Sequence, residues 1–306
     1  MSTVALVIPS YRRPSSLARA IAAAHNQSEP LDEIVVVARD EDTATHEVAN
    51  ATGVRLVTVS SPGVLAAMWA GAQATNSDVV GFSDDDATVD THWARDVRKN
   101  FDLPGNERVG GVGGRDCLYD GETPRPTTLT NDVGRLTSWG RLVGNHHRGE
   151  GPAREVHVLK GVNCAYRRGA LVLPIGLRGE GAQAHFEVAV GTELRRRGWR
   201  LLYDPSLRVD HRPDDRVGAD QRAAPTAAAI ADSAFNLERS LPRGLQSRRW
   251  LYVHIFGDGA CPGIARCLIA LLRGERDVLA RRAPSWRGTT EAWRLRRTPL
   301  SFHELP

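Results

Sequence analysis

The sequence contains few cysteines and no long apolar run, and both features limit what the protein can be. Its four cysteines are Cys117, Cys164, Cys261 and Cys267, too few for a disulfide framework and spaced unlike a metal site. No stretch reaches the roughly 18 uncharged apolar residues that a spanning helix needs. The first ten residues lack the positive start and cleavage site of a signal peptide. We therefore expect a cytoplasmic protein with reduced thiols, either free or peripheral at the inner face of a membrane.

Lysine is nearly absent, since Lys99 and Lys160 are the only lysines among 40 basic residues. The arginines are concentrated in the last third of the chain. Such a basic end suits phosphates, anionic lipid or an ordinary solvated helix face. Nucleic acid is the weakest option, because the chain shows no zinc-finger spacing, no RNP-type aromatic motif and no basic–aromatic interleaving. We predict no nucleic-acid partner.

The first hundred residues alternate short apolar runs with helical patterns. Strands are expected at 4–8, 33–38, 54–59 and 78–82, and helices at 15–24, 64–74 and 92–101. Apolar strands that alternate with helices are typical of βαβ units and of a parallel sheet covered on both faces. The sequence therefore predicts an α/β protein with a Rossmann-like, mostly parallel sheet flanked by helices.

The pattern breaks between residues 109 and 154, where Gly110–Gly114 is dense in glycine and we expect irregular loops that line a site. Order returns later in the chain, at 156–166, 185–197, 200–203 and 207–210. Beyond residue 213 the character becomes helical, over about 223–234 and over 248–280 with a break at 257–263. We predict a domain over 1–215, divided near residue 105 into 1–105 and 106–215, and a C-terminal helical extension over 216–306.

Three polar clusters follow predicted strands: Ser10–Arg13, Arg39–Asp42 and Ser83–Asp86. In an open parallel sheet the ligand lies outside the carboxyl ends of the strands. Residues that are distant in sequence are therefore expected to converge on one crevice.

The sharpest signal is the triplet Asp84, Asp85 and Asp86. Adjacent carboxylates repel one another unless they are hydrated or bound to a cation. Oxygen ligands of this kind favour Mg²⁺ or Mn²⁺, which often bind through one or two carboxylates and substrate phosphates. The alternative is an acidic, solvated turn before the helix that starts near His92.

Arginines that follow the first strand are suited to a diphosphate, because a guanidinium pairs with phosphate in a bidentate fork. Arg12 or Arg13 is therefore expected to face such a group, with surface exposure as the alternative. Tyr11 could pack on a nucleobase or cap the core. Asp40 could accept a hydrogen bond from a base or ribose, or simply be solvated.

The combination of motifs resembles family 2 glycosyltransferases of GT-A fold. The resemblance covers about residues 3–213 and is carried by Val7–Pro14, Gly63–Ala67, Phe82–Asp86, Leu159–Asn163 and His185–His211. It implies an inverting, metal-dependent transfer of a sugar from a nucleotide diphosphate donor of UDP, GDP or dTDP type to an acceptor hydroxyl. The acceptor itself is not identified.

The resemblance also implies roles for single residues. The metal, Mg²⁺ or Mn²⁺, is expected at Asp86 with Asp84 and His211. The expected nucleotide- and donor-binding residues are Pro9, Tyr11, Arg13, Asp40, Asp84, Asp85, Gly161 and Asn163. The alternative for His211 is an ordinary strand-end histidine.

Glu187 stands where the family has its catalytic aspartate, counted back from Gly198. The family usually shows a Glu-Asp pair where this chain has Phe186-Glu187, and asparagine where it has Trp69. Direct displacement at the anomeric carbon needs a base on the acceptor hydroxyl, which Glu187 would supply. The rival interpretations are a sugar nucleotidyltransferase, which would need a glycine-rich loop after the first strand, and a non-catalytic sugar-nucleotide-binding protein.

Two further regions are expected to bind partners. His146 and His147 could contact the acceptor or simply order the loop. Trp139 could stack on a sugar ring of the acceptor, with packing in the core as the alternative. In the extension, Ile264, Cys267, Leu268, Leu271 and Leu272 recur on one helical face bordered by arginines. This face could pack on the rest of the chain, form a homodimer, or contact a membrane as part of residues 248–282. We expect packing or dimerisation, because an apolar stripe is more often core than membrane contact.

Overall fold

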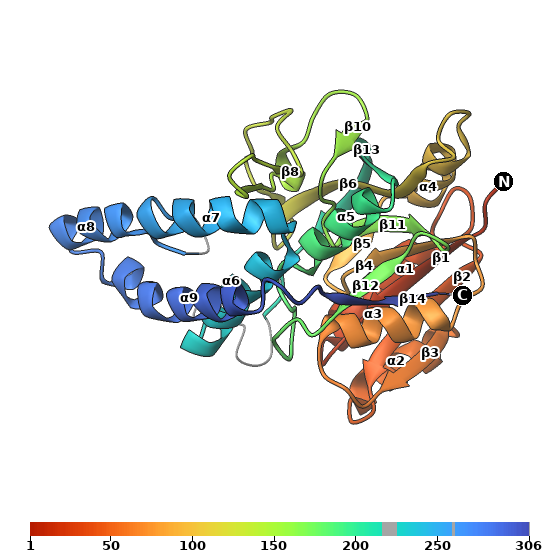
Figure 1. Cartoon of the computed structure of the whole chain (residues 1–306). Helices are drawn as coiled ribbons and strands as arrows, with labels where there is room; N and C mark the ends of the chain where they lie inside the picture. The colour runs from red at the N-terminus through yellow and green to blue at the C-terminus, as the bar shows by residue number, and fades with distance from the viewer. Residues whose placement is uncertain (216–224, 259–260, 306) are drawn as a thin grey trace.

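In the computed structural model, the N-terminal half of the chain forms a parallel sheet with helical connections (Figure 1). The structure describes residues 1–215, 225–258 and 261–305. The elements of this half are β1 (Val4–Pro9), α1 (Pro14–His25), β2 (Glu33–Arg39), α2 (Thr43–Thr52), β3 (Arg55–Val59), α3 (Val64–Gln73) and β4 (Val79–Ser83). The strands pair in parallel in the order β4-β1-β2-β3. The predicted βαβ pattern is confirmed, although α2 was not expected.

The second half extends the same sheet in a mixed direction. Its elements are β5 (Ala87–Val89), α4 (Trp93–Asp102), β6 (Val109–Asp120), β10 (Arg154–Val156), β11 (Asn163–Arg167), α5 (Phe186–Arg196) and β13 (Arg200–His211). The complete order is β10-β13-β6-β11-β4-β1-β2-β3. β6 and β13 are parallel, whereas β11 lies antiparallel between β6 and β4. The α/β sheet is therefore as predicted, with antiparallel pairs in this half.

The prediction of loops from residue 109 is wrong for the first twelve residues, which form the continuous strand β6. Its glycines permit close packing rather than turns. A Cβ atom on Gly114 would lie 1.7 Å from the carbonyl oxygen of Leu207 on β13. Residues 121–153 hold only the short strands β7 (Thr123–Pro124), β8 (Arg135–Leu136) and β9 (Leu142–Val143) and the 3-10 helix η1 (His146–Arg148), so this part is as irregular as expected.

Each face of the sheet carries its own apolar core. One core contains Leu17 and Ile21 of α1 with Trp93 of α4, and the other contains Met68 of α3 with Leu194 of α5. These five side chains are almost completely buried. The two cores therefore fix the ends of the strands relative to one another.

The described part of the C-terminal extension forms helices that project from the sheet as an arm (Figure 1). They are α6 (Ala227–Ser240), α7 (Arg243–Ile255), α8 (Ile264–Arg273) and α9 (Arg276–Arg294). The helix predicted at 223–234 begins in residues that lie outside the described ones. α6 joins the arm to the sheet domain through Asn236, which accepts a hydrogen bond from the Arg178 N–H (2.7 Å) and donates one to the Arg178 carbonyl (2.8 Å).

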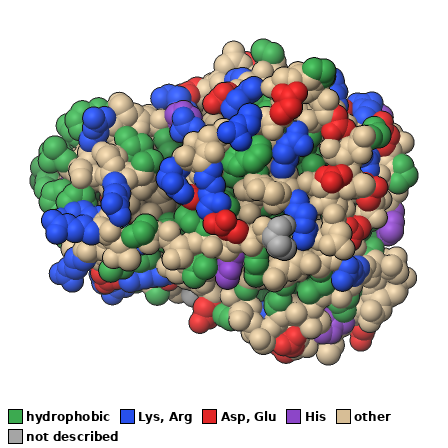
Figure 2. Space-filling model, turned by 45° about the vertical axis from the view of Figure 1, so that its right-hand side comes forward, with side chains coloured by type: hydrophobic (Ala, Val, Ile, Leu, Met, Phe, Trp, Pro, Cys, Tyr) green, Lys and Arg blue, Asp and Glu red, His purple; other side chains and the backbone are tan. Residues whose placement is uncertain are grey.

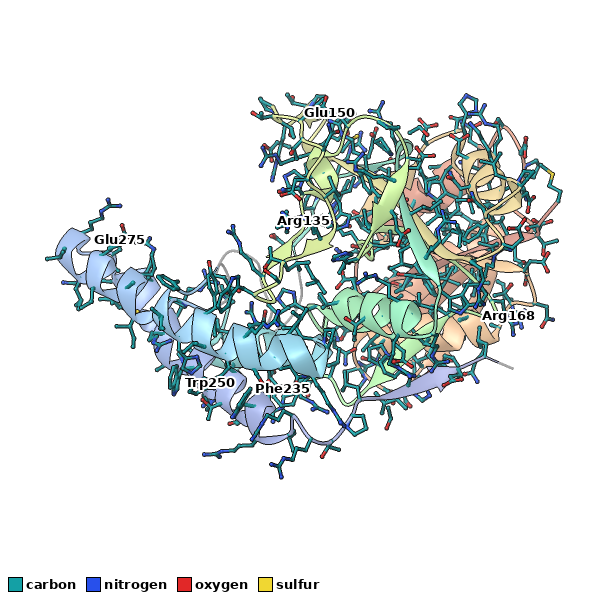
Figure 3. All side chains as sticks on the ribbon, turned by 45° about the horizontal axis from the view of Figure 1, so that its top comes forward. Arg135, Glu150, Arg168, Phe235, Trp250 and Glu275 are labelled. Atoms are coloured by element: carbon teal, nitrogen blue, oxygen red, sulfur yellow. The ribbon has the colours of Figure 1, made fainter. Side chains whose placement is uncertain are left out.

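The interior of the arm holds a buried ionic group and an aromatic cluster. The Arg249 guanidinium lies 3.3 Å from the Glu238 carboxylate and 2.6 Å from that of Asp258. Trp250, labelled in Figure 3, contacts Trp286 and Trp293 of α9 at centroid distances of 6.4 and 5.5 Å. α7 and α9 are therefore packed as one unit.

The prediction of a helical extension over 216–306 is wrong for residues 301–304, which form a strand outside the arm. Strand β14 (Ser301–Glu304) returns and pairs antiparallel with β12 (Val172–Ile175). His303 stacks on Trp69 of α3 with ring centroids 4.7 Å apart. Trp69, at the position where the resembling family usually has asparagine, therefore packs against the C-terminal strand.

Among the helices that the structure describes, none has both the length and the apolar character needed to cross a membrane.

Candidate functional site

The ends of β4 and β13 bring two carboxylates and an imidazole together. Ligand atoms of Asp84, Asp86 and His211 all lie within 4.8 Å of one another. Asp84 and Asp86 follow β4 directly, and His211 ends β13, which reaches the same place through β5. These are the three residues that the sequence analysis assigned to a metal.

Arg13 links the first strand to this carboxylate group. Its guanidinium lies 2.6 Å from Asp85 Oδ1 and 2.9 Å from Asp86 Oδ2. The Ser10 hydroxyl donates a hydrogen bond to Asp85 Oδ2 (2.8 Å). Asp85 is completely buried, and this burial raises its pKa to about 7 against the opposing effect of Arg13. Asp85 thus holds Arg13 from inside the protein and lines neither of the cavities described below.

Asp86 is the electrostatic centre of the group. Its Oδ1 atom lies 3.3 Å from His211 Nε2, and its Oδ2 atom accepts a hydrogen bond from the Asp214 N–H (3.0 Å). Burial opposes ionisation of Asp86, but the contacts with His211 and Arg13 outweigh it and lower its pKa to about 2. Asp86 is therefore a carboxylate at neutral pH.

His211 is held from its other side by Asp116, which the sequence analysis did not identify. Asp116 lies on β6, is completely buried, and accepts a hydrogen bond from the Lys160 ammonium. Its Oδ2 atom is 3.7 Å from His211 Nδ1. Burial opposes protonation of His211, but Asp116 and Asp86 outweigh it and raise the pKa of the imidazole. A carboxylate behind an imidazole in this way orients the ring.

The three clustered residues fit a divalent cation. They offer two carboxylates and one imidazole, a donor set suited to Mg²⁺ or Mn²⁺. In addition, Asp86 Oδ1 and His211 Nε2 are both buried 3.3 Å apart, and neither forms a hydrogen bond of regular geometry within the described part of the chain. A buried acceptor without a donor is costly unless a ligand satisfies it. Asp84 and Asp86, with His211, are therefore the residues that would hold the ion.

A first cavity of about 190 Å³ lies beside the carboxylate group, between the ends of β1 and β2 and the start of α3. Pro9, Tyr11 and Arg13 line it, together with Asp84, Asp86 and the segment 180–182, and their nucleotide contacts stay a prediction. Arg39 also lines it, and its guanidinium lies 5.8 Å from the Tyr11 ring centroid. Asp40 is exposed and is not among the lining residues, so its nucleotide contact stays a prediction.

A second cavity of about 340 Å³ adjoins the first. The two cavities share Pro9, Val64, Asp84 and Ala182. Lys160, Gly161, Glu187 and His211 are among the residues that line the second one. Asp84 therefore lies at the junction of the two cavities, where it could contact a ligand in either one.

Glu187 reaches the second cavity from the first turn of α5. Its Oε1 atom accepts a hydrogen bond from the Gly161 N–H (3.3 Å). Burial raises the pKa of this carboxyl above its usual value, and the Gly161 contact reduces that effect. A Cβ atom on Gly161 would lie 2.9 Å from Phe186 Cζ and 3.3 Å from Glu187 Oε1, so a glycine is needed there for this approach.

Two of the predicted donor and acceptor residues line neither cavity. Asn163 is completely buried; it accepts from the Trp93 indole N–H (2.9 Å) and donates to the Leu207 carbonyl (2.9 Å). Trp139 is half-exposed beside Tyr252 of α7, with centroids 6.3 Å apart, and lines neither cavity. We infer a supporting role for Asn163, while the acceptor contact of Trp139 stays a prediction.

The two adjacent histidines differ in their placement. His146 lines the second cavity but is buried, with its Nε2 atom 2.9 Å from the Val158 carbonyl. Burial lowers the pKa of His146 to about 4, so the ring is neutral near pH 7. His147 is half-buried, and burial lowers its pKa as well. His146 is thus the one of the pair that reaches a cavity.

Comparison with known proteins gives one family and several similar folds. Residues 2–225 match the sequence profile of the family described as glycosyltransferase like family 2. No curated protein sequence matches the chain significantly.

Three solved structures illustrate the likeness of fold. The mannosyltransferase PcManGT from Pyrobaculum calidifontis, in complex with GDP-Man and Mn²⁺, is 15% identical at a TM-score of 0.57, over 97% of this chain and 87% of that one. GalNAc-T7 with UDP, GalNAc and Mn²⁺ is 17% identical at a TM-score of 0.60, over 97% of this chain and 58% of that one. A mycobacterial protein is 19% identical at a TM-score of 0.54, over 81% and 75% of the two chains.

Proposed function

The chain belongs to glycosyltransferase-like family 2 and is a glycosyltransferase, and from this premise we propose a metal-assisted, inverting transfer. The donor is a nucleotide diphosphate sugar of UDP, GDP or dTDP type, and the acceptor is a hydroxyl group. The proposed binding of such a donor is supported by two proteins of the same fold that were solved with GDP-Man or UDP and with Mn²⁺.

One observation carries the proposal: the two cavities meet at Asp84, beside the candidate metal ligands. The first cavity offers Tyr11 and Arg39 for the nucleoside and Arg13 for the diphosphate. The second cavity offers a carboxylate, Glu187, on the opposite side of that junction. A sugar bound at the junction would have a leaving group on one side and a base on the other, which is the arrangement that a single displacement requires.

The chemistry then follows from the residues on each side. Glu187 accepts the proton of the acceptor hydroxyl while the oxygen of that hydroxyl forms a bond to the anomeric carbon. The bond from that carbon to the diphosphate oxygen breaks with its electron pair, and Arg13 helps to neutralise the departing charge. A bound divalent cation would supply further charge stabilisation to the diphosphate. A single displacement inverts the anomeric centre without a covalent intermediate on the protein.

Calorimetry with UDP, GDP and dTDP, each with and without Mn²⁺, tests this function at the binding step. We expect one nucleotide to bind at least about tenfold more tightly with the metal, since the ion would join protein carboxylates to phosphate oxygens. Asp86→Asn should abolish that difference, whereas Asp120→Asn, an exposed carboxylate paired with Arg125, should retain it. Metal-dependent binding that survives Asp86→Asn unchanged would contradict the proposed site.

A further inference from the structure

The apolar residues of α8 face solvent instead of the protein. Ile264, Leu268, Leu271 and Leu272 are 54%, 58%, 62% and 89% exposed. With Ile269, which is 43% exposed, we call these residues the apolar tip. Of the expected packing or dimerisation, packing on the rest of the chain is wrong, because an amphipathic helix that packs on its own protein hides its apolar side; dimerisation stays a prediction.

The opposite side of α8 holds the helix in place. Ala270 is completely buried, and at 100° per residue it lies about 160° around the helix from Leu268. The Arg266 guanidinium also forms an ion pair with Glu275 (2.5 Å), which precedes α9. The apolar tip therefore faces outward, while the other face of α8 contacts the rest of the arm.

The position of α8 suits contact with a large partner. α8 lies at the end of the arm that is farthest from the sheet (Figure 1). Figure 2 shows hydrophobic and basic side chains gathered at this end of the molecule, and Glu275 marks the same end in Figure 3. No other described element covers these side chains, as their exposure shows.

The charge around the tip identifies the chemistry of the partner. Residues 261–282, which contain α8 and the start of α9, hold five arginines and two acidic residues, an excess of three positive charges. Arg273, which is largely exposed, borders the apolar side chains on α8, and the exposed Arg276 follows at the start of α9. Apolar side chains with a basic border match a lipid surface that carries negative headgroups.

We propose that the apolar tip of α8 docks on an anionic lipid surface, with the leucines below the headgroups and the arginines among them. A second copy of the chain is the less suitable occupant, because a two-fold contact of the same surface would bring both arginine borders together. The proposal does not depend on the enzymatic reaction.

Flotation of the full chain with vesicles tests the proposal without any measurement of activity. The probes are phosphatidylcholine vesicles and vesicles with about one third phosphatidylglycerol, at low and high salt. We expect binding to the anionic vesicles at low salt, and at least tenfold weaker binding to neutral vesicles or at high salt, because the headgroup attraction is screened.

Paired variants separate the two parts of the surface. Leu268→Asp with Leu272→Asp should weaken binding at least tenfold, whereas Leu103→Asp, at an exposed leucine of the sheet domain, should not. Arg273→Gln with Arg276→Gln, at the exposed arginines beside the tip, should weaken binding roughly 30-fold at low salt, at about 1 kcal/mol per arginine. Arg55→Gln with Arg196→Gln, at exposed arginines elsewhere, is the matched control. All variants are expected to unfold at the wild-type temperature.

The results that overturn the proposal are equally specific. They are no flotation of the wild type, equal binding to neutral and anionic vesicles, or wild-type binding by both tip variants. A dimer in light scattering that Leu268→Asp with Leu272→Asp dissociates, in a protein that does not float, would assign the surface to a second copy instead.

Discussion

Glu187 combines the two properties that a general base needs, access to a cavity and a carboxyl that burial makes more basic. Its position in the first turn of α5 favours a negative charge there, and the Gly161 N–H supports the carboxylate. The desolvation that raises its pKa also makes the carboxylate a stronger proton acceptor. The base is therefore active above the raised pKa and is lost as the pH falls through it.

Glu187→Gln keeps the size of the side chain and removes the basic carboxylate. We expect kcat to fall by about 10² or more, with nucleotide affinity close to that of the wild type. The wild type should lose kcat toward acidic pH at a pH above the ordinary glutamate range, and the variant should lack this dependence. Steady-state kinetics over a pH series measures both.

The matched control is Glu193→Gln on the same helix. Glu193 pairs with Arg196 and Arg197, each at 2.7 Å, so its loss should leave the pH profile unchanged. If Glu187→Gln retains most of its turnover with the acceptor, the base lies elsewhere.

Asp116 acts through His211, and this separates it from residues that touch the ligand. Asp116→Asn should weaken Mn²⁺ binding by about 10- to 100-fold, as the loss of a carboxylate behind a metal-bound imidazole does. Titration with Mn²⁺ measures this effect, and thermal unfolding measures any general loss of stability. Asp204→Asn, on the same strand as His211 but bonded to Asn100, should leave Mn²⁺ affinity unchanged. Equal Mn²⁺ affinity in the Asp116 variant would show that its role is structural.

For single residues, sequence patterns indicated which side chains gather at the site better than they indicated which way each side chain is turned. The place of Asp84 and Asp86 at a common crevice could be predicted, because polar residues at strand ends converge in this type of sheet, whereas His211 was expected only from the family resemblance. The pattern could not show that Asp85, between two cavity-lining aspartates, is turned inward to Ser10 and Arg13. Asp116 was missed because it lies in a segment so rich in glycine that no strand was expected there.

Among the elements, β6 shows how glycine can mislead. Glycine usually weakens a strand or marks a bend, but it also allows the close approach of another backbone. Along β6 the second effect applies, since Gly114 lies against the β13 backbone. The register shift of β13 between Asp204 and Arg208 accounts for the two separate strands predicted there.

Gly114→Ala should therefore be strongly destabilising. The added methyl group would lie 1.7 Å from the Leu207 carbonyl oxygen, and backbone cannot move aside as a flexible side chain can. We expect a loss of about 3 kcal/mol or more in the free energy of unfolding, measured by denaturant titration. Gly144→Ala is the control, because a Cβ atom there would have no neighbour within 4 Å. Similar stability of the two variants would contradict the close packing.

The helices of the arm illustrate a different limit of prediction. Periodicity showed correctly that residues 264–272 form one apolar helical face, because this depends on local sequence alone. It could not show whether that face is covered, since burial depends on what the rest of the chain places beside it. Similarly, the break after Arg273 follows from Gly274, whose φ of 67° ends α8, and was not expected.

For the molecule as a whole, the last residues join parts of the chain that lie far apart in the sequence. After α9 the chain returns to pair with β12 and to contact Trp69 of α3 and Arg197, which follows α5. Pairing between segments about 130 residues apart leaves no local signal in the sequence, so the predicted boundary near residue 215 gave no sign of it. The family match over residues 2–225 likewise ends before this strand.

Removal of residues 301–306 should therefore destabilise the sheet domain and not only the arm. The deletion would expose the edge of β12, remove the Phe302 side chain from the core on the α3 side of the sheet, and break the Trp69–His303 stack and the Arg197–Glu304 ion pair (2.7 Å). We expect a loss of roughly 2–4 kcal/mol, mainly from the apolar contacts, because an exposed ion pair contributes little. Thermal unfolding followed by the near-ultraviolet signal measures the loss.

Glu304→Gln, which removes only the ion pair, should have a free energy of unfolding within about 0.5 kcal/mol of the wild type. The stability of Phe302→Ala should fall between that of Glu304→Gln and that of the deletion. An unfolding temperature unchanged by the deletion would mean that the strand adds nothing to the stability of the domain on which it lies.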